Sequence, residues 1–348
     1  YYNSCVILDD GSVRCWGQNN GGGSGSTISI GTGRIAVTIT AGFDHACAIL
    51  DDASLVCWGG NSNGQLGDGT LSASTSPVSV DLGTGRTAAA VAAGHYHTCA
   101  ILDDASLVCW GDNGHGRLGD GTNTDSSSPV SVDLGSGRTA AALALGNSHT
   151  CAVLDDASLK CWGNGELGTD STSSSYAPAS VTFDAGRTVV AIALGDGHTC
   201  AILDNLTVQC WGENGDGQVG DGTTTVRTTP VYVSLSGSLA AVSERDLDGD
   251  GTLNIFDTHI KGRSLEGSIY GNSTLALGAY YACAIMDDNS LYCWGYNGLG
   301  QLGDGTTTSS STPVIVDLGT GRTAVSVTAG DGHTCAILDD GSMKCWGH

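Results

Sequence analysis

Basic residues and long hydrophobic runs are both scarce in this sequence of 348 residues. Lys and Arg together number 13 against 36 Asp and Glu, which gives a formal net charge of −23 at pH 7. The phosphates of nucleic acids and of anionic lipids repel such a chain, so no nucleic acid partner is expected. No apolar stretch reaches the roughly 18–20 residues of a membrane-spanning helix, so direct membrane insertion is not expected either.

Proline is also rare, with 5 residues, whereas glycine is abundant, with 54. The apolar residues make up 40% of the chain and occur in short bursts. This composition is typical of many short strands joined by tight turns, and it disfavours helices. It therefore predicts an all-β protein.

One unit recurs seven times, and its clearest copy is HTCAILDDASLVCWG at 97–111. Each copy has two cysteines separated by nine residues, and Trp-Gly follows the second cysteine. The commonest interval between copies is 52 residues, and one interval of 83 contains an insertion of 31. All 14 cysteines belong to these pairs, which are Cys5 with Cys15, Cys47 with Cys57, Cys99 with Cys109, Cys151 with Cys161, Cys200 with Cys210, Cys283 with Cys293, and Cys335 with Cys345.

The repeated unit is predicted to be a β-hairpin with two apolar faces. A three-residue turn at 51–53 pairs Ile49 with Leu55 and brings Cys47 opposite Cys57, all on one face. The other face carries Ala48, Leu50, Val56 and Trp58. Because both faces are apolar, each hairpin must pack between two neighbours, as the blades of a propeller do.

Two further strands complete each unit. Segments rich in small residues precede the hairpins, for example at 87–94 and 139–146, and they suit the crowded innermost strand of a blade. The motif PVSV follows the hairpins, at 77–80 and 129–132, and suits the outermost strand because a sheet edge tolerates proline. Seven such units predict one seven-bladed β-propeller over residues 1–348, with residues 244–273 as an insertion.

The cysteine pairs predict one cross-strand disulfide in each blade. A zinc site is the alternative, but it needs four converging ligands, usually with a Cys-x2–4-Cys spacing that this chain lacks. Disulfides persist outside the cytosol. We therefore expect a secreted protein that works in the extracellular space, at a cell surface or in a periplasm.

The motif NGQLGDGT at 63–70 and its variants at 115–122 and 299–306 follow the Cys-Trp-Gly unit and resemble the RCC1 repeat. The resemblance covers nearly the whole chain apart from the insertion. It implies a seven-bladed propeller from a family whose members serve mainly as binding platforms. The cysteine pair in every blade departs from the founding nuclear nucleotide-exchange member, and it is closer to a secreted bacterial branch that includes an inhibitor of β-lactamase.

The insertion contains the acidic segment DLDGDGTLNIFD at 246–257, which predicts a Ca²⁺ site. Ca²⁺ prefers six to eight oxygen ligands, and this spacing wraps them around one ion. The loop resembles those of dockerins and other EF-hand-like modules, and the alternative is a solvated acidic loop. The predicted ligands are Asp246, Asp248, Asp250, the main-chain carbonyl of Thr252, Asn254 and Asp257.

Recognition sites are expected where the repeat is broken. Aromatic residues replace small polar ones in the loop before several hairpins, and they predict a contact surface for a protein or glycan. These residues are Tyr2, Phe43, Tyr96 and Tyr280. The alternative is that the rings only pack within the loops.

Other polar residues recur in most blades and are predicted to be structural. The Asp-Asp turns and the Arg residues near them suit turn formation and ion pairs between blades. The repeated His before each hairpin suits a structural hydrogen bond rather than a metal site. Asn205 and Asn272 each begin a glycosylation sequon on an expected surface loop, and the alternative is that they are unmodified.

Catalysis needs a unique set of nucleophile, base and stabilising groups, and almost every polar residue here is a repeat position, so no enzyme is expected. The first and last units are hairpins that lack an innermost and an outermost strand respectively. Such open edges invite head-to-tail self-association. The sequence thus predicts a non-catalytic extracellular binding or structural propeller within a surface protein or fibre. The alternative is a secreted inhibitor or ligand-binding propeller that recognises a protein or glycan through loops on one face.

Overall fold

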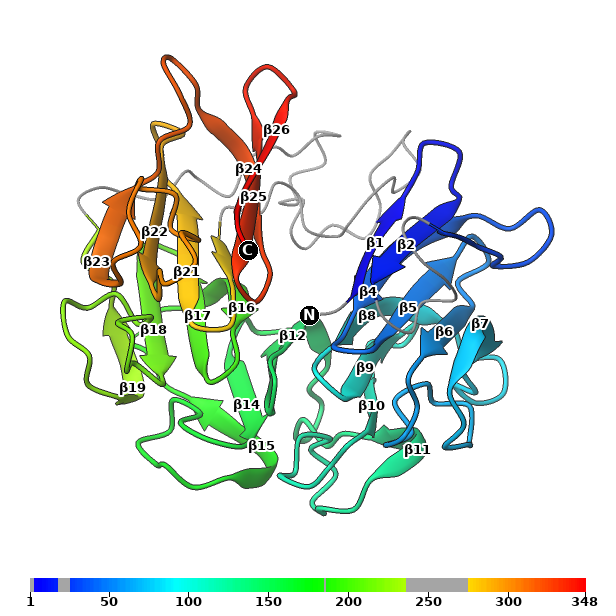
Figure 1. Cartoon of the computed structure of the whole chain (residues 1–348). Coiled ribbons are helices and arrows are strands. Elements are labelled where there is room, and N and C mark those ends of the chain that lie inside the picture. Colours follow the sequence, from blue (N-terminus) through cyan, green and yellow to red (C-terminus); the bar gives the residue numbers. More distant parts are fainter. Residues whose placement is uncertain (1–2, 18–25, 185, 236–274) are drawn as a thin grey trace, which may run out of the picture. The chain divides into compact units, whose positions relative to one another are not determined.

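The computed structural model describes residues 3–17, 26–184, 186–235 and 275–348. These residues form seven antiparallel sheets, which we number as blades 1 to 7 along the chain (Figure 1). Blades 2 to 6 have four strands, called A to D in sequence order, and they pair in that order. Blade 1 has strands B to D and blade 7 has strands A to C. None of the elements in these ranges is a helix long and apolar enough to cross a membrane.

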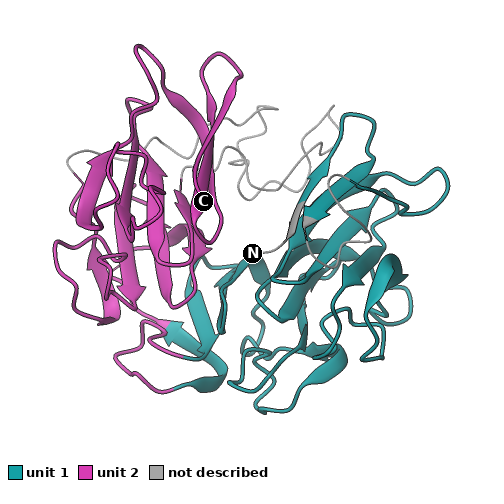
Figure 2. Ribbon diagram, in the orientation of Figure 1, with its two compact units in different colours: residues 1–164, 174–180, 263–269 teal, residues 165–173, 181–262, 270–348 magenta. Residues whose placement is uncertain are grey.

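The chain divides into two compact units, coloured teal and magenta in Figure 2. Unit 1 contains blades 1 to 4, with residues 1–164 and 174–180, whereas the blade 4 loop at 165–173 belongs to unit 2. Its strands are β1 (Asn3–Ile7), β2 (Val13–Gly17), β3 (Ser26–Ile28), β4 (Ala36–Ala41), β5 (His45–Leu50), β6 (Leu55–Gly59), β7 (Ser74–Ser79), β8 (Ala88–Ala93), β9 (His97–Leu102), β10 (Leu107–Gly111), β11 (Ser126–Ser131), β12 (Ala140–Leu145), β13 (His149–Leu154), β14 (Leu159–Gly163) and β15 (Ser175–Val181).

Unit 2 contains blades 5 to 7. Its strands are β16 (Val189–Leu194), β17 (His198–Leu203), β18 (Val208–Gly212), β19 (Arg227–Tyr232), β20 (Leu275–Leu277), β21 (Tyr281–Ile285), β22 (Leu291–Gly295), β23 (Ser310–Ile315), β24 (Ala324–Ala329), β25 (His333–Leu338) and β26 (Met343–Gly347). The insertion at 244–273 lies outside the described residues, and so do Tyr2, Asn272 and the whole predicted Ca²⁺ loop at 246–257.

The predicted hairpin register is confirmed. Cys47 faces Cys57 and Ile49 faces Leu55 across β5 and β6. The three-residue turn closes with a 2.9 Å hydrogen bond from the Leu50 N–H to the Ser54 carbonyl. The residue before the second strand takes a left-handed conformation, with φ of 61° at Ala53, as expected for a three-residue hairpin loop.

All seven predicted disulfides are present, one in each blade, and the paired Cα atoms lie 4.0–4.1 Å apart. All 14 cysteines lie in the described ranges, and none of them is free. Each disulfide joins strands B and C of its own blade, as the sequence predicted. The bonds link Cys5 to Cys15, Cys47 to Cys57, Cys99 to Cys109, Cys151 to Cys161, Cys200 to Cys210, Cys283 to Cys293, and Cys335 to Cys345.

In blades 2, 3 and 6 the two faces of the hairpin pack on different neighbours. In blade 2 the face with Cys47 and Cys57 packs against strands of blade 3, including Val91 and Trp110. The opposite face packs against blade 1. This arrangement explains why both faces of the repeat are apolar: in blades 2, 3 and 6 the disulfide-bearing sheet forms one wall of two separate cores.

One asparagine holds the long loop between strands C and D. The Asn61 Nδ2 donates to the carbonyls of Thr70 and Ser72, both at 3.1 Å, and its Oδ1 accepts from the Leu66 N–H at 3.0 Å. Blades 3, 5 and 6 repeat this arrangement with Asn113, Asn214 and Asn297. In these blades the C–D loops thus have a fixed shape.

The repeated histidines link neighbouring blades within unit 1. The His45 ring nitrogen Nε2 lies 2.8 Å from the Thr98 hydroxyl of blade 3, and His97 contacts Thr150 of blade 4 at 2.9 Å. In unit 2 the Tyr281 hydroxyl replaces the imidazole and accepts a 3.0 Å hydrogen bond from Thr334. The predicted structural role is confirmed for these residues.

Acid is expected to destabilise unit 1 through these histidines. Burial, with a contribution from His95, lowers the pKa of His45 to about 3, and burial lowers that of His149 to about 4. Below about pH 6.5 these histidines become protonated in the unfolded chain but stay neutral in the folded chain. The free energy of unfolding should therefore fall by about 1.4 kcal/mol per pH unit for each such histidine, between pH 6.5 and the folded pKa.

Urea unfolding of the intact protein between pH 7 and pH 5 measures this loss. A His45→Gln variant should lose less stability with falling pH than the parent protein. The exposed His115 is the control, and His115→Gln should leave the pH dependence unchanged. Equal slopes for the parent and the His45→Gln variant would contradict the assignment.

The repeated Arg and Asp residues form clamps at the opposite end of the blades. Arg86 pairs with Asp103 at 3.0 Å and also with Asp104. Both acids lie in the B–C turn of blade 3, the blade whose strand A follows Arg86. The prediction of ion pairs between blades is therefore wrong: each clamp closes one blade, because the D–A loop runs beside the turn of the blade it leads into.

Candidate functional site

The A–B and C–D loops meet at one end of every blade from 2 to 6, and in blade 7 His348, which follows strand C, makes the same contact with the A–B loop. The main-chain N–H of the residue after Trp-Gly donates to the carbonyl of a residue in the A–B loop. In blade 2 the Gly60 N–H donates to the Asp44 carbonyl at 2.7 Å, and in blade 3 Asp112 donates to Tyr96 at 2.9 Å. The bond uses main-chain atoms alone, so it places no demand on the side chains.

Those side chains differ from blade to blade. Three residues of each blade are called its display positions. They are the residue that accepts this bond, the residue that precedes it in the A–B loop, and the residue after Trp-Gly that donates the bond. The display positions are Phe43, Asp44 and Gly60 in blade 2, His95, Tyr96 and Asp112 in blade 3, Asn147, Ser148 and Asn164 in blade 4, Asp196, Gly197 and Glu213 in blade 5, Ala279, Tyr280 and Tyr296 in blade 6, and Asp331, Gly332 and His348 in blade 7. The opposite B–C turns keep nearly the same Asp-Asp sequence throughout. Variation is therefore concentrated on one end of the repeat.

In unit 1 three display positions form an aromatic cluster, consisting of Phe43, His95 and Tyr96. The ring centroids of Phe43 and His95 lie 4.4 Å apart, those of Phe43 and Tyr96 5.3 Å, and those of His95 and Tyr96 5.1 Å. The Phe43 N–H also donates to the His95 carbonyl at 3.1 Å. All three side chains are partly exposed. The structure thus brings together two of the predicted aromatic residues and adds His95.

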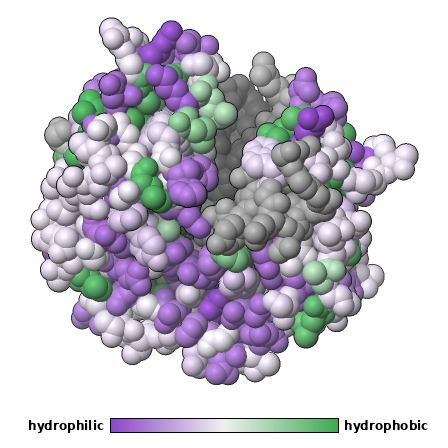
Figure 3. All heavy atoms as spheres, in the orientation of Figure 1, coloured by the Kyte–Doolittle hydropathy of each residue, from purple (hydrophilic) through white to green (hydrophobic). Residues whose placement is uncertain are grey.

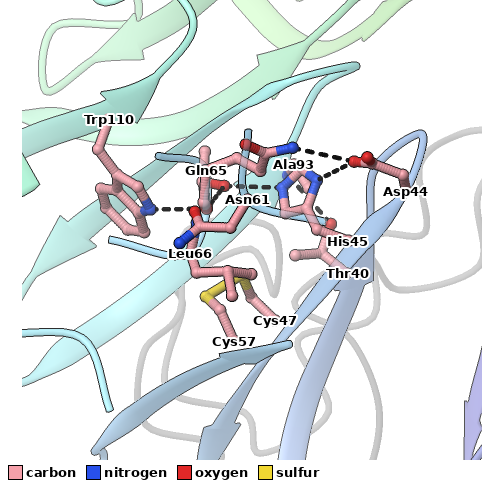
Figure 4. The surroundings of a disulfide bond; sticks show 11 residues. Thr40, Asp44, His45, Cys47, Cys57, Asn61, Gln65, Leu66, Ala93 and Trp110 are labelled. Carbon is pink, nitrogen blue, oxygen red and sulfur yellow. Dashed lines mark hydrogen bonds and ion pairs between the residues drawn. A yellow bond between two sulfur atoms is a disulfide. The ribbon is translucent and has the colours of Figure 1, made fainter. Parts of the chain in front are cut away.

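Two carboxylates are display positions beside this cluster. The Asp44 carboxylate accepts a 3.0 Å hydrogen bond from the Gln65 side chain (Figure 4), and burial raises its pKa. In blade 3 the Asp112 Oδ1 accepts from the Gly114 N–H at 2.9 Å. Both carboxylates are therefore fixed by donors from their own blades.

Arg117 takes the repeat position that Gln occupies in other long C–D loops. Its side chain is 5% exposed and its guanidinium lies 3.4 Å from the Asp112 Oδ2. Burial lowers the pKa of Arg117, while Asp112 and Asp125 oppose this shift. The charge of this arginine is thus directed inward, toward Asp112.

In unit 2 three of the nine display positions are acidic, namely Asp196, Glu213 and Asp331. Burial, followed by the charges of Asp331 and Glu213, raises the pKa of Asp196 to about 6. The Tyr280 hydroxyl bonds to Asp196, and its ring is exposed. Tyr280 belongs to this unit and not to the aromatic cluster of unit 1. Among the residues that the structure describes, no three His, Cys, Asp or Glu side chains are placed to hold a metal ion.

Asn205 lies in the exposed B–C turn of blade 5, where the other blades have Asp. Its side-chain oxygen accepts from the Thr207 N–H at 3.2 Å and from the Thr207 hydroxyl at 2.7 Å. The sequon is therefore on the surface, and its modification stays a prediction. The face drawn in Figure 3 is mostly hydrophilic or intermediate, with hydrophobic residues in small separate spots.

Sequence reasoning missed Asp44, His95, Asp112 and Arg117. A signal for Asp112 was available, because the residue after Trp-Gly differs in every blade from 2 to 7. The sequence carried no signal for the proximity of His95 to Phe43, since this contact depends on how two A–B loops approach each other in space.

The sequence matches the family model of the regulator of chromosome condensation (RCC1) repeat at residues 52–101, 104–153, 161–202 and 288–337. A second model of the same repeat matches 1–22, 36–65, 88–117, 140–169, 189–218 and 273–301. The chain belongs to the RCC1 repeat family. The repeats run through both units, with the insertion between the matched parts.

The chain is similar to the ultraviolet-B receptor UVR8 of Arabidopsis thaliana, with 28% identity over 98% of this chain and 74% of that protein. The crystal structure of human WBSCR16 is similar over 97% of this chain and 84% of that one, at 21% identity and a TM-score of 0.75. Prp20p of Saccharomyces cerevisiae is similar over 95% and 78%, at 14% identity and a TM-score of 0.74. These likenesses confirm the fold class, an all-β seven-bladed propeller.

Proposed function

We propose that this RCC1-repeat protein is a non-catalytic, secreted propeller that binds a protein partner through its display positions. One observation carries the proposal: the side chains vary where main-chain hydrogen bonds hold the loops, while the rest of the repeat is nearly constant. Fixed loops with variable, partly exposed side chains are suited to recognition. Prp20p, which has the same fold, is described as binding Gsp1p and histones.

Seven disulfides support the extracellular part of the proposal, because such bonds persist in oxidising compartments. The aromatic cluster favours recognition of a partner through one face over a purely structural role, since aromatic residues are enriched in binding hot spots. Membership of a surface assembly, head-to-tail self-association and glycan binding are competing uses of the same fold.

Site-specific photo-crosslinking tests the proposed surface. A photoreactive residue replaces either Ser148, a partly exposed display position in blade 4, or Ser131, an exposed residue of β11 in the same unit. In native medium, we expect crosslinks to a distinct protein from position 148 and none from position 131. Crosslinks from 131 alone, or between copies of this chain alone, would contradict the proposal.

We further propose that the loop at 246–257 binds one Ca²⁺ ion, with the six predicted ligands. The support is the spacing of its oxygen-bearing residues, which suits an ion that takes six to eight oxygens. Binding to the folded chain alone would stabilise it by about 2.7 kcal/mol at a Ca²⁺ concentration 100-fold above the dissociation constant.

Isothermal titration of the intact protein measures this site. We expect one Ca²⁺ per chain, a lower unfolding temperature after chelation, and loss of both effects in an Asp246→Asn, Asp250→Asn variant. Asp81→Asn, in the D–A loop of blade 2, is the control and should bind Ca²⁺ as the parent does. Absence of binding heat in the parent protein would leave the acidic loop as a solvated segment.

A further inference from the structure

We propose that the aromatic cluster of unit 1, together with Asp44 and Asp112, docks a lysine or arginine side chain from an exposed basic segment of the partner protein. This inference rests on the proposed function and adds the chemistry of the partner. It follows from three properties of the described residues: the packing of the rings, the charge around them and the exposure of the two carboxylates.

The three rings are held in one arrangement before any partner arrives. Each ring contacts the other two, and the hydrogen bond from the Phe43 N–H to the His95 carbonyl fixes the two loops relative to each other. The centroid distances of 4.4–5.3 Å leave no room for a cation between the rings. A cation must therefore bind on the outward side of the cluster, where the face of an aromatic ring attracts it. A fixed surface of this kind loses little conformational entropy on binding.

The charge around the cluster has one sign. The A–B and C–D loops of blades 2 and 3 are described in full at 42–44, 60–73, 94–96 and 112–125. Arg117 is the only Lys or Arg residue within these ranges. Its side chain is buried and faces Asp112. The acids in the same ranges are Asp44, Asp68, Asp112, Asp120 and Asp125. The surface is thus complementary to a positively charged segment.

Both carboxylates keep part of their surface open. The side chain of Asp44 is 19% exposed and that of Asp112 is 21% exposed. Partial burial weakens solvent screening, so an approaching ammonium or guanidinium interacts more strongly with these groups than with a fully exposed acid. The guanidinium of Arg117 lies 3.4 Å from the Asp112 Oδ2, which is longer than a close ion pair, and part of the Asp112 side chain stays exposed beside it.

The same geometry disfavours a neutral glycan. Sugar rings stack on an open aromatic face and need free hydrogen-bonding groups around it. Here the rings pack against one another at interplanar angles of 51–71°, so no two of them form a flat platform for a sugar ring. The negative charge of the acidic residues around the cluster does not strengthen the binding of a neutral sugar, whereas it strengthens the binding of a cation.

Fluorescence anisotropy of the intact protein with a dye-labelled peptide tests the inference. The probe alternates Gly-Ser with Lys-Arg, and the reference peptide carries Gln in place of Lys and Arg. We expect saturable binding of the basic peptide and none of the reference. Raising the ionic strength from about 0.01 M to about 0.15 M should weaken binding, because it shortens the screening length from about 30 Å to about 8 Å.

Two disruptive variants, one conservative variant and two matched controls locate the site. Tyr96→Ala should weaken peptide binding about 3- to 30-fold, the range of cation–π energies, and Tyr96→Phe should keep most of it. Asp112→Asn should weaken it about 3- to 10-fold. Leu71→Ala removes a side chain that is 63% exposed in a C–D loop of the same unit, and it should change binding less than about twofold. Asp81→Asn should also have little effect, although Asp81 accepts from the Gly83 N–H at 3.0 Å just as Asp112 accepts from Gly114.

Three results would overturn the inference: no binding of the basic peptide, equal binding of the Gln peptide, or unchanged binding by both Tyr96→Ala and Asp112→Asn. Binding of neutral glucose or N-acetylglucosamine oligosaccharides that Tyr96→Ala abolishes would assign the cluster to a glycan instead. If position 148 still crosslinks a partner while the basic peptide fails to bind, the proposed function stands and the cationic chemistry is wrong.

Discussion

Protein whose seven disulfides have been reduced in denaturant and then alkylated is expected not to refold. Each disulfide closes a short loop, since its cysteines are 10 residues apart in sequence, and contributes about 2–3 kcal/mol in the chain-entropy model. Even partial additivity over seven bonds exceeds much of the 5–15 kcal/mol that typically stabilises a domain. Far-ultraviolet circular dichroism and tryptophan fluorescence after removal of denaturant measure the outcome.

A single missing disulfide provides the comparison. Replacing both Cys99 and Cys109 by Ala should cost only about 2–3 kcal/mol and leave the protein folded. Mild reductant without denaturant should leave this bond intact, because both cysteines are fully buried. Native spectra from fully reduced and alkylated protein would show that packing alone maintains the blades.

Trp110→Ala is expected to be among the most destabilising single substitutions in unit 1, at about 3–5 kcal/mol. The side chain is 0% exposed and packs between blades 2 and 3, so its removal leaves a cavity in that core. Its indole N–H also donates to the Gln65 carbonyl at 2.9 Å, which leaves this buried carbonyl with one donor fewer. Figure 4 shows this contact beside the Cys47–Cys57 disulfide.

Denaturant unfolding of matched variants separates the two contributions. Trp110→Phe keeps most of the ring and loses the hydrogen bond, so its cost should be smaller than that of Trp110→Ala. Leu71→Ala removes an exposed side chain and should cost less than about 0.5 kcal/mol. A cost for Trp110→Ala no greater than that for Leu71→Ala would contradict the packing described for this core.

The sequence predicted the hairpins because two independent patterns agree. The nine-residue cysteine spacing sets the register of Cys47 against Cys57, and the alternation of apolar residues sets the two faces. Tertiary relations were less accessible. The repeated Arg residues were expected to join neighbouring blades, whereas the Arg86 clamp closes one blade, since sequence alone does not show which turn lies beside a D–A loop.

The candidate site was predicted in part for a similar reason. Phe43 and Tyr96 stood out because they break a repeat, and the structure places their rings 5.3 Å apart. His95 did not stand out, because histidine is common in this chain and its role depends on the approach of two loops. Asp112 and Arg117 were missed because their importance depends on the 3.4 Å contact between them, which the sequence does not show.

The main-chain bond between Asp112 and Tyr96, and its counterparts in the other blades, separates loop shape from loop chemistry. Residues at these positions can be exchanged one blade at a time while the backbone keeps its path. The protein is therefore a natural starting point for combinatorial libraries, in which new specificities are assembled blade by blade on an oxidised, preformed frame. The same property lets duplication and point mutation diversify such repeats in evolution without first rebuilding their cores.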